Sequence, residues 1–76
     1  MTQQEIKIAK RIEVYMSSIA EQQIDLNFFM GLGFALAIVY EESTGYSAQN
    51  RKPKEIMEWA RNLPLVTYPH VEKRTN

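Results

Sequence analysis

Apolar residues recur every three or four positions along the first twenty residues, which is the period of an amphipathic helix. Thr2 and Glu5 match a capping box, in which the threonine hydroxyl and the glutamate carboxylate each accept a backbone hydrogen bond. We therefore predict a helix over about residues 3–23, with Ile6 and Val14 outside its inward stripe. The stripe itself consists of Ile8, Ile12, Tyr15, Met16 and Ile19.

The second segment is apolar without a period, because Asn27 is the only polar side chain in residues 26–40. A strand is the competing interpretation of a short apolar run, but the length of this one favours a helix. Asp25 is suited to cap its start and Gly45 to end it, so we predict a helix over about residues 26–43. A helix that is apolar on all sides has to be surrounded by protein.

A third helix is predicted over about residues 53–63. Pro53 is suited to the first helical position, where its missing N–H is not needed, and Pro64 ends the pattern. Residues 65–69 are then expected to form an extended strap that packs back on the helices. The prediction is a single all-α domain over residues 1–76, a compact three-helix domain with a central hydrophobic helix and a C-terminal strap.

Two amphipathic helices and a strap are too little to cover a helix that is apolar on all sides. Monomers rarely expose large contiguous apolar patches, so a homodimer through the central helix is expected. Gly31 and Gly33 favour either close approach of a second copy or packing under an aromatic side chain such as Trp59 of the same chain. Trp59 is expected in the core or as an anchor in a partner's pocket. The expected dimer interface consists of Phe28, Phe29, Gly33, Leu36 and Ala37.

Membrane insertion is not expected for the apolar run. At about 1.5 Å per residue it spans on the order of 22 Å, whereas a membrane helix needs about 20 apolar residues. Acidic residues flank it on both sides, without a positive-inside signal. The 76 residues limit the chain to one domain and contain no cysteine, so we expect a cytoplasmic protein without a disulfide framework.

Nine basic and nine acidic residues balance over the whole chain, but their distribution is uneven. Residues 21–45 carry four acids and no base, whereas residues 46–76 carry six bases and three acids. Two interpretations stay open: surface ion pairs between the two groups, worth about 0 to 1 kcal/mol each, or a charged surface for a partner. The expected partner-binding residues are Glu41, Glu42, Tyr46, Arg51, Lys52 and Lys54.

The sequence contains no motif for catalysis or cofactor binding. It has one histidine, His70, and no serine stands in a nucleophile elbow or a glycine-rich loop. We therefore expect no enzymatic activity, no metal site and no cofactor. Residues 41–47 superficially match the turn of a helix-turn-helix, but Arg51 stands where an apolar anchor is needed and Pro53 would lie inside the recognition helix.

These observations predict a non-enzymatic protein-binding module that acts as a homodimer. In size and in its lack of catalytic motifs the chain resembles compact helical proteins among accessory and phage-encoded gene products, which bind and block a larger host protein. This resemblance implies an inhibitor or adaptor. The alternative is a small nucleic-acid-binding regulator that uses the 51–54 basic cluster together with a second basic face, formed by Lys7, Lys10 and Arg11.

Overall fold

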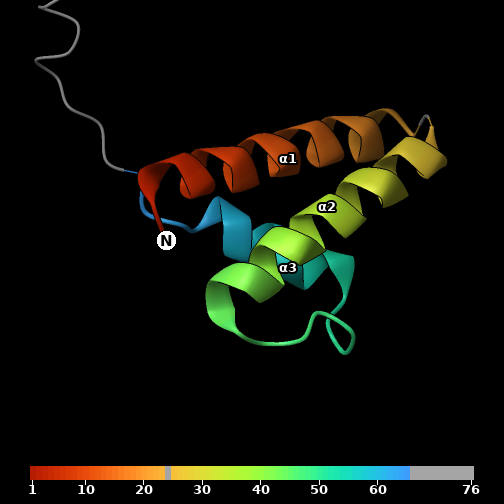
Figure 1. The fold of residues 1–76 in the computed structure, drawn as a ribbon. Coiled ribbons are helices and arrows are strands. Elements are labelled where there is room, and N and C mark those ends of the chain that lie inside the picture. The colour runs from red at the N-terminus through yellow and green to blue at the C-terminus, as the bar shows by residue number, and fades with distance from the viewer. Residues whose placement is uncertain (24, 66–76) are drawn as a thin grey trace, which may run out of the picture.

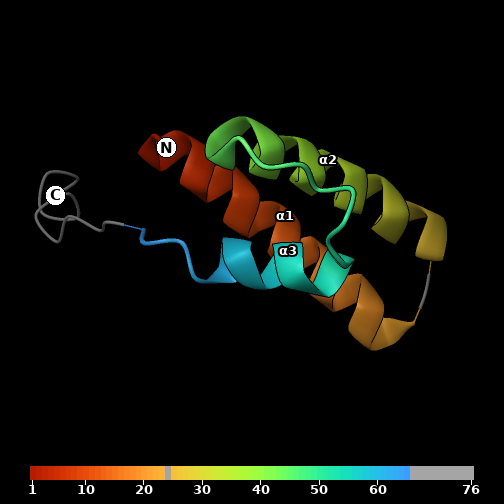
Figure 2. The same cartoon turned by 90° about the horizontal axis from the view of Figure 1, so that it is seen from below.

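The computed structural model describes residues 1–23 and 25–65, and within these ranges the chain forms three helices and no strand (Figure 1). They are α1 (Gln3–Gln22), α2 (Leu26–Thr44) and α3 (Pro53–Arg61). α1 and α2 run in opposite directions, and α3 contacts both of them (Figure 2). The prediction of an all-α three-helix fold is confirmed, and each helix end lies within two residues of its expected position. The expected strap lies mostly outside the described residues.

Local capping interactions fix the helix ends. The Thr2 hydroxyl accepts from the Glu5 amide at 3.1 Å and the Glu5 carboxylate accepts from the Thr2 amide at 2.7 Å, which completes the predicted capping box. The Asp25 carboxylate accepts from the Phe28 amide at 3.0 Å at the start of α2. Gly45 ends α2 in the left-handed conformation, with φ of 77°, and its amide donates to the Glu41 carbonyl.

The core lies where the three helices meet. Its two largest fully buried side chains are Met16 of α1 and Leu36 of α2. The Trp59 ring packs edge-on against the Tyr40 ring, with centroids 5.1 Å apart and an interplanar angle of 86°. Of the two expectations for Trp59, the structure therefore supports the core. The buried core consists of Ala9, Met16, Leu36, Tyr40, Ile56 and Ala60.

The inward face of α1 differs from the predicted stripe. Ile6, expected outside the stripe, is 4% exposed, whereas Ile8 and Tyr15, expected inside it, are 44% and 50% exposed. The reason is that α1 packs against α3 as well as α2, so its buried arc is rotated toward α3. This rotation buries a carboxylate, that of Glu13, which is 6% exposed and paired with Arg61 of α3.

Ile6 and Ile8 provide a matched test of this rotated face. Ile6→Ala should lower the free energy of unfolding by about 2 to 5 kcal/mol, the range for truncating a buried large side chain. Ile8→Ala removes the same atoms from a position that is nearly half exposed, so its loss should stay below about 1 kcal/mol. Urea denaturation at low protein concentration measures both values. A larger loss for Ile8→Ala would contradict the rotated face.

Candidate protein-binding surface

One side of α2 is not covered by any other part of the described chain. Four large side chains at intervals of four residues follow this side, and each is 56–67% exposed. We call them the apolar row: Leu26, Met30, Phe34 and Ile38. Large side chains bury on the order of 150 to 250 Å² each, so the row presents roughly 400 to 500 Å² of apolar area. That is comparable to the largest apolar patch on a typical monomer, which is often functional.

The exposed apolar surface continues from α2 onto α1. Ile8 of α1 lines a shallow groove together with Ile38 and Val39 of α2, and Glu42 stands at its end. Tyr15, which is also half-exposed, lines a different hollow together with Leu32 of α2. None of the described helices is long and apolar enough to cross a membrane.

At its other edge the apolar row borders a pocket of about 220 Å³. Met30 and Phe34 contribute to one wall, and Arg51 and Pro53 to the wall formed by the segment that enters α3. Core residues such as Leu36 close the bottom. Small-molecule sites usually measure about 300 to 1,000 Å³, so this pocket has a size suited to a single side chain.

The acidic residues predicted for partner binding do not pair with the basic ones. The Glu41 carboxylate accepts from the Ala48 amide at 2.7 Å and so holds the 45–52 loop. Within residues 1–23 and 25–65 the only ion pair is that of Arg61 with Glu13. The surface ion pairs considered between Glu41 or Glu42 and the 51–54 cluster are therefore absent from the described structure. Glu42, Arg51, Lys52 and Lys54 are all exposed.

The 45–52 loop separates the two groups of charges. It runs from the C-terminal end of α2 back along that helix, so that α3 begins beside the N-terminal half of α2 (Figures 1 and 2). Arg51 consequently borders the same pocket as Met30 and Phe34, and Lys52 and Lys54 line a second hollow with Phe29. Tyr46, on the loop itself, is 65% exposed. Lys52 and Lys54 thus lie near the start of α2, Arg51 lies at the pocket beside Met30 and Phe34, and Glu42 lies at the other end of the apolar row, beside Ile38.

The five residues expected at a dimer interface occupy different environments. Phe28 is exposed, whereas Phe29 and Ala37 are half-buried against the core. Leu36 is 1% exposed and is not available to a second copy. A Cβ at Gly33 would lie 3.4 Å from the Met16 methyl, so this glycine faces α1 and not solvent. Gly31 has nothing within 4 Å of its Cβ position and is the glycine that faces outward.

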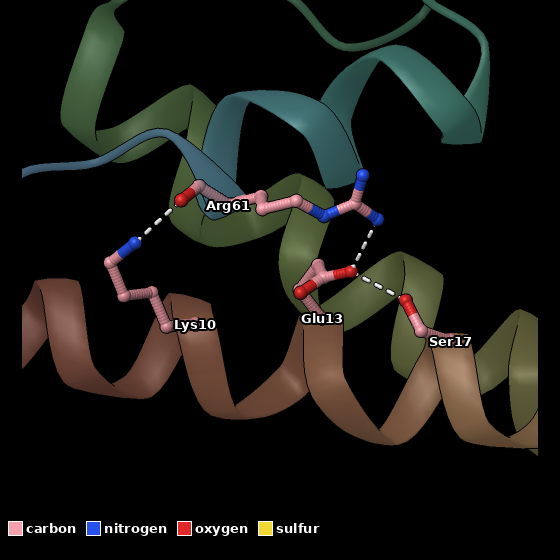
Figure 3. Close-up of polar contacts among 4 residues, drawn as sticks. All are labelled: Lys10, Glu13, Ser17 and Arg61. Atoms are coloured by element: carbon pink, nitrogen blue, oxygen red, sulfur yellow. Dashed lines mark hydrogen bonds and ion pairs between the residues drawn. The ribbon is translucent and has the colours of Figure 1, made fainter.

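A buried carboxylate joins α1 to α3 (Figure 3). The Glu13 carboxylate accepts from the Ser17 hydroxyl and, at 2.7 Å, from the Arg61 guanidinium, and Lys10 donates to the Arg61 carbonyl at 2.7 Å. Burial raises the pKa of Glu13, but the hydrogen bonds from Ser17 and Arg61 and the nearby positive charges outweigh it and hold this pKa below its ordinary value. The cluster stabilises the helix packing and was not expected from the sequence.

The described residues hold no group of three or more histidine, cysteine or acidic side chains that could bind a metal ion. His70 lies outside the described residues. Searches against protein-family models, curated proteins and solved structures find no match for the chain. The interpretation of the surface therefore rests on its own geometry.

The two helical glycines should respond differently to a large side chain. A Cβ at Gly33 already contacts the Met16 methyl at 3.4 Å, so Gly33→Leu requires Met16 to repack and should lower the free energy of unfolding by about 1 kcal/mol. Gly31→Leu points into open space and should not destabilise the fold of a single chain. Urea denaturation at low protein concentration distinguishes the two. Equal losses would show that Gly33 is not packed against α1.

The lowered pKa of Glu13 makes part of the stability depend on pH. Its contribution is complete above the ordinary glutamate pKa of about 4.3 and is lost as the pH falls through the lower pKa of the folded state. The stability difference between wild type and Glu13→Gln should therefore shrink between pH 7 and pH 3. Urea midpoints at the two pH values measure it. Glu21→Gln, at an exposed position, is the control, and a difference that is independent of pH would contradict the account.

Proposed function

We propose that this chain is a non-enzymatic protein-binding module, an inhibitor or adaptor of a larger protein, that acts as a homodimer in the cytoplasm. The apolar row carries the proposal, because four large apolar side chains on one helix side are more than half exposed. At about 25 cal/mol per Å², covering roughly 400 to 500 Å² contributes on the order of 10 kcal/mol before the entropic cost of association. A protein surface is the natural cover for a patch of this size.

The surroundings of the apolar row support protein recognition. Protein interfaces combine an apolar centre with a polar rim, and tyrosine and arginine are frequent among the residues that dominate binding. Here Arg51 borders the pocket beside the apolar row, and the exposed Tyr46 lies on the same loop as Arg51. Complementary charge on a partner would then govern the rate and the selectivity of association.

The use of the other polar side chains favours binding over catalysis. The buried carboxylate of Glu13 is bound by Ser17 and Arg61, and Glu41 is bound to the loop backbone. Both groups therefore hold the fold together.

Two of the three bases of the second basic face also make contacts within the chain. Lys10 donates to the Arg61 carbonyl, and the Arg11 guanidinium lies 5.5 Å from the centre of the Tyr15 ring. This favours a protein partner over the alternative of nucleic acid.

The proposed function is tested by immobilising the purified chain and identifying the proteins that it captures from a cell lysate. Phe34→Asp places a charge at the centre of the apolar row, so proteins retained by the wild type should be lost. Val14→Asp is the matched control, because Val14 is 58% exposed and lies outside the apolar row. It should retain them. The result that would overturn the proposal is the same set of captured proteins on both variants.

A further inference from the structure

We infer that the apolar row is covered by a second copy of this chain, whose α2 packs antiparallel to the first about a two-fold axis near Phe34. This inference rests on the proposed function, whose homodimer it specifies: the second copy covers the row, and the dimer is the form that binds a larger protein at its exposed rim, where Tyr46 stands. It is carried by three observations: the area exposed, the regular spacing of the row, and the separation of the charges at its two ends.

The exposed area matches what a stable dimer needs. The apolar row presents roughly 400 to 500 Å². Homodimer interfaces are about 65% apolar, so with its polar rim a row of this size corresponds to roughly 600 to 800 Å² on each copy. Standard protein interfaces bury about 800 Å² on each partner. In a two-fold dimer the same surface is used twice, so one surface of this size on each copy is sufficient.

The spacing of the row suits an antiparallel arrangement. Met30 and Ile38 each lie four residues from Phe34, so a two-fold axis at Phe34 places Met30 of one copy opposite Ile38 of the other. Leu26, the fourth member of the row, then lies at the edge of the contact, level with Glu42 of the other copy. The outward Gly31, with nothing within 4 Å of its Cβ position, allows the two helices to approach closely.

Charge decides between the antiparallel and the parallel arrangement. Lys52 and Lys54 line a hollow with Phe29 near the start of α2, and Arg51 borders the pocket that Met30 and Phe34 also line. Glu42 stands beside Ile38 at the other end. In an antiparallel pair the basic end of each copy lies next to the acidic end of the other, twice per dimer. In a parallel pair Arg51 would meet Arg51 and Glu42 would meet Glu42, and such like charges destabilise an interface. Neither side chain forms an ion pair within the described part of its own chain.

Disulfide trapping tests the arrangement directly, because the chain has no cysteine of its own. Met30→Cys and Ile38→Cys are made on two chains of different tag length, mixed and oxidised. Eight helical residues span about 12 Å, whereas a disulfide needs Cα atoms within about 7 Å. The antiparallel dimer should give the mixed 30–38 product. Products of each variant with itself would show a parallel pair and overturn the arrangement.

The charge argument has its own test in sedimentation equilibrium of purified chain. Arg51→Glu puts an acid next to the acidic end of the other copy and should raise the dimer dissociation constant about tenfold at low salt. Lys7→Glu, the same charge reversal at an exposed position of α1, should change it much less. Equal effects of the two reversals would contradict the pairing of opposite ends.

Failure of this inference and failure of the proposed function give different results. Wild type and Val14→Asp should be dimers and Phe34→Asp a monomer, with unchanged helical content by circular dichroism. A purified wild type that stays monomeric at every concentration would overturn the second copy. If capture of another protein still depended on Phe34 in that case, the proposed function would stand without the dimer. If the wild type is monomeric and capture does not depend on Phe34, both the dimer and the proposed function are overturned.

Discussion

The rest of this structure depends on one constraint: two helices, α1 and α3, are too few to surround the third helix, α2, on all sides. α2 carries apolar side chains around its whole circumference, and α1 and α3 cover only the arc that contains residues such as Leu36 and Tyr40. The opposite arc keeps Phe34 and its neighbours more than half exposed. Within residues 1–23 and 25–65 no further element covers this surface. The exposed side of α2 is thus a consequence of how few helices pack against it.

The same shortage of helices explains how α1 is used. Because α1 is in contact with both α2 and α3, its buried arc is wider than one apolar stripe and includes Ile6 and Glu13. A buried carboxylate is tolerated only when it is paired and hydrogen-bonded, and Arg61 and Ser17 provide both. Arg61 at the end of α3 also accepts from Lys10 through its carbonyl, so one residue joins α1 to α3 twice. This polar cluster joins α1 to α3, whereas in a longer chain a larger apolar core would hold the helices together.

The helix ends could be predicted from the sequence, but the faces could not. Thr2, Asp25 and Pro53 act on residues only a few positions away, and such local signals can be recognised in the sequence alone. An apolar helix has no period from which its orientation can be deduced, so Leu36 and Gly33 were assigned to a dimer interface although they face the chain's own core. For Glu41 the sequence left open an ion pair with a base or contact with a partner, whereas its carboxylate binds the Ala48 amide, a contact that depends on the path of a loop.

The path of the 45–52 loop makes the two ends of the apolar row differ in charge. If the chain had continued away from α2 after Gly45, the bases of residues 51–54 would lie beyond the C-terminal end of α2, next to its acids. Instead, Glu41 holds the loop and the chain returns along α2, so that Arg51 lies beside Met30. An apolar row with a base at one end and acids at the other distinguishes the two orientations of any helix laid on it. A uniformly apolar surface would not, and apolar contact is non-directional. In the proposed dimer the apolar row would therefore supply the burial energy, and the charges that the loop positions would select the orientation.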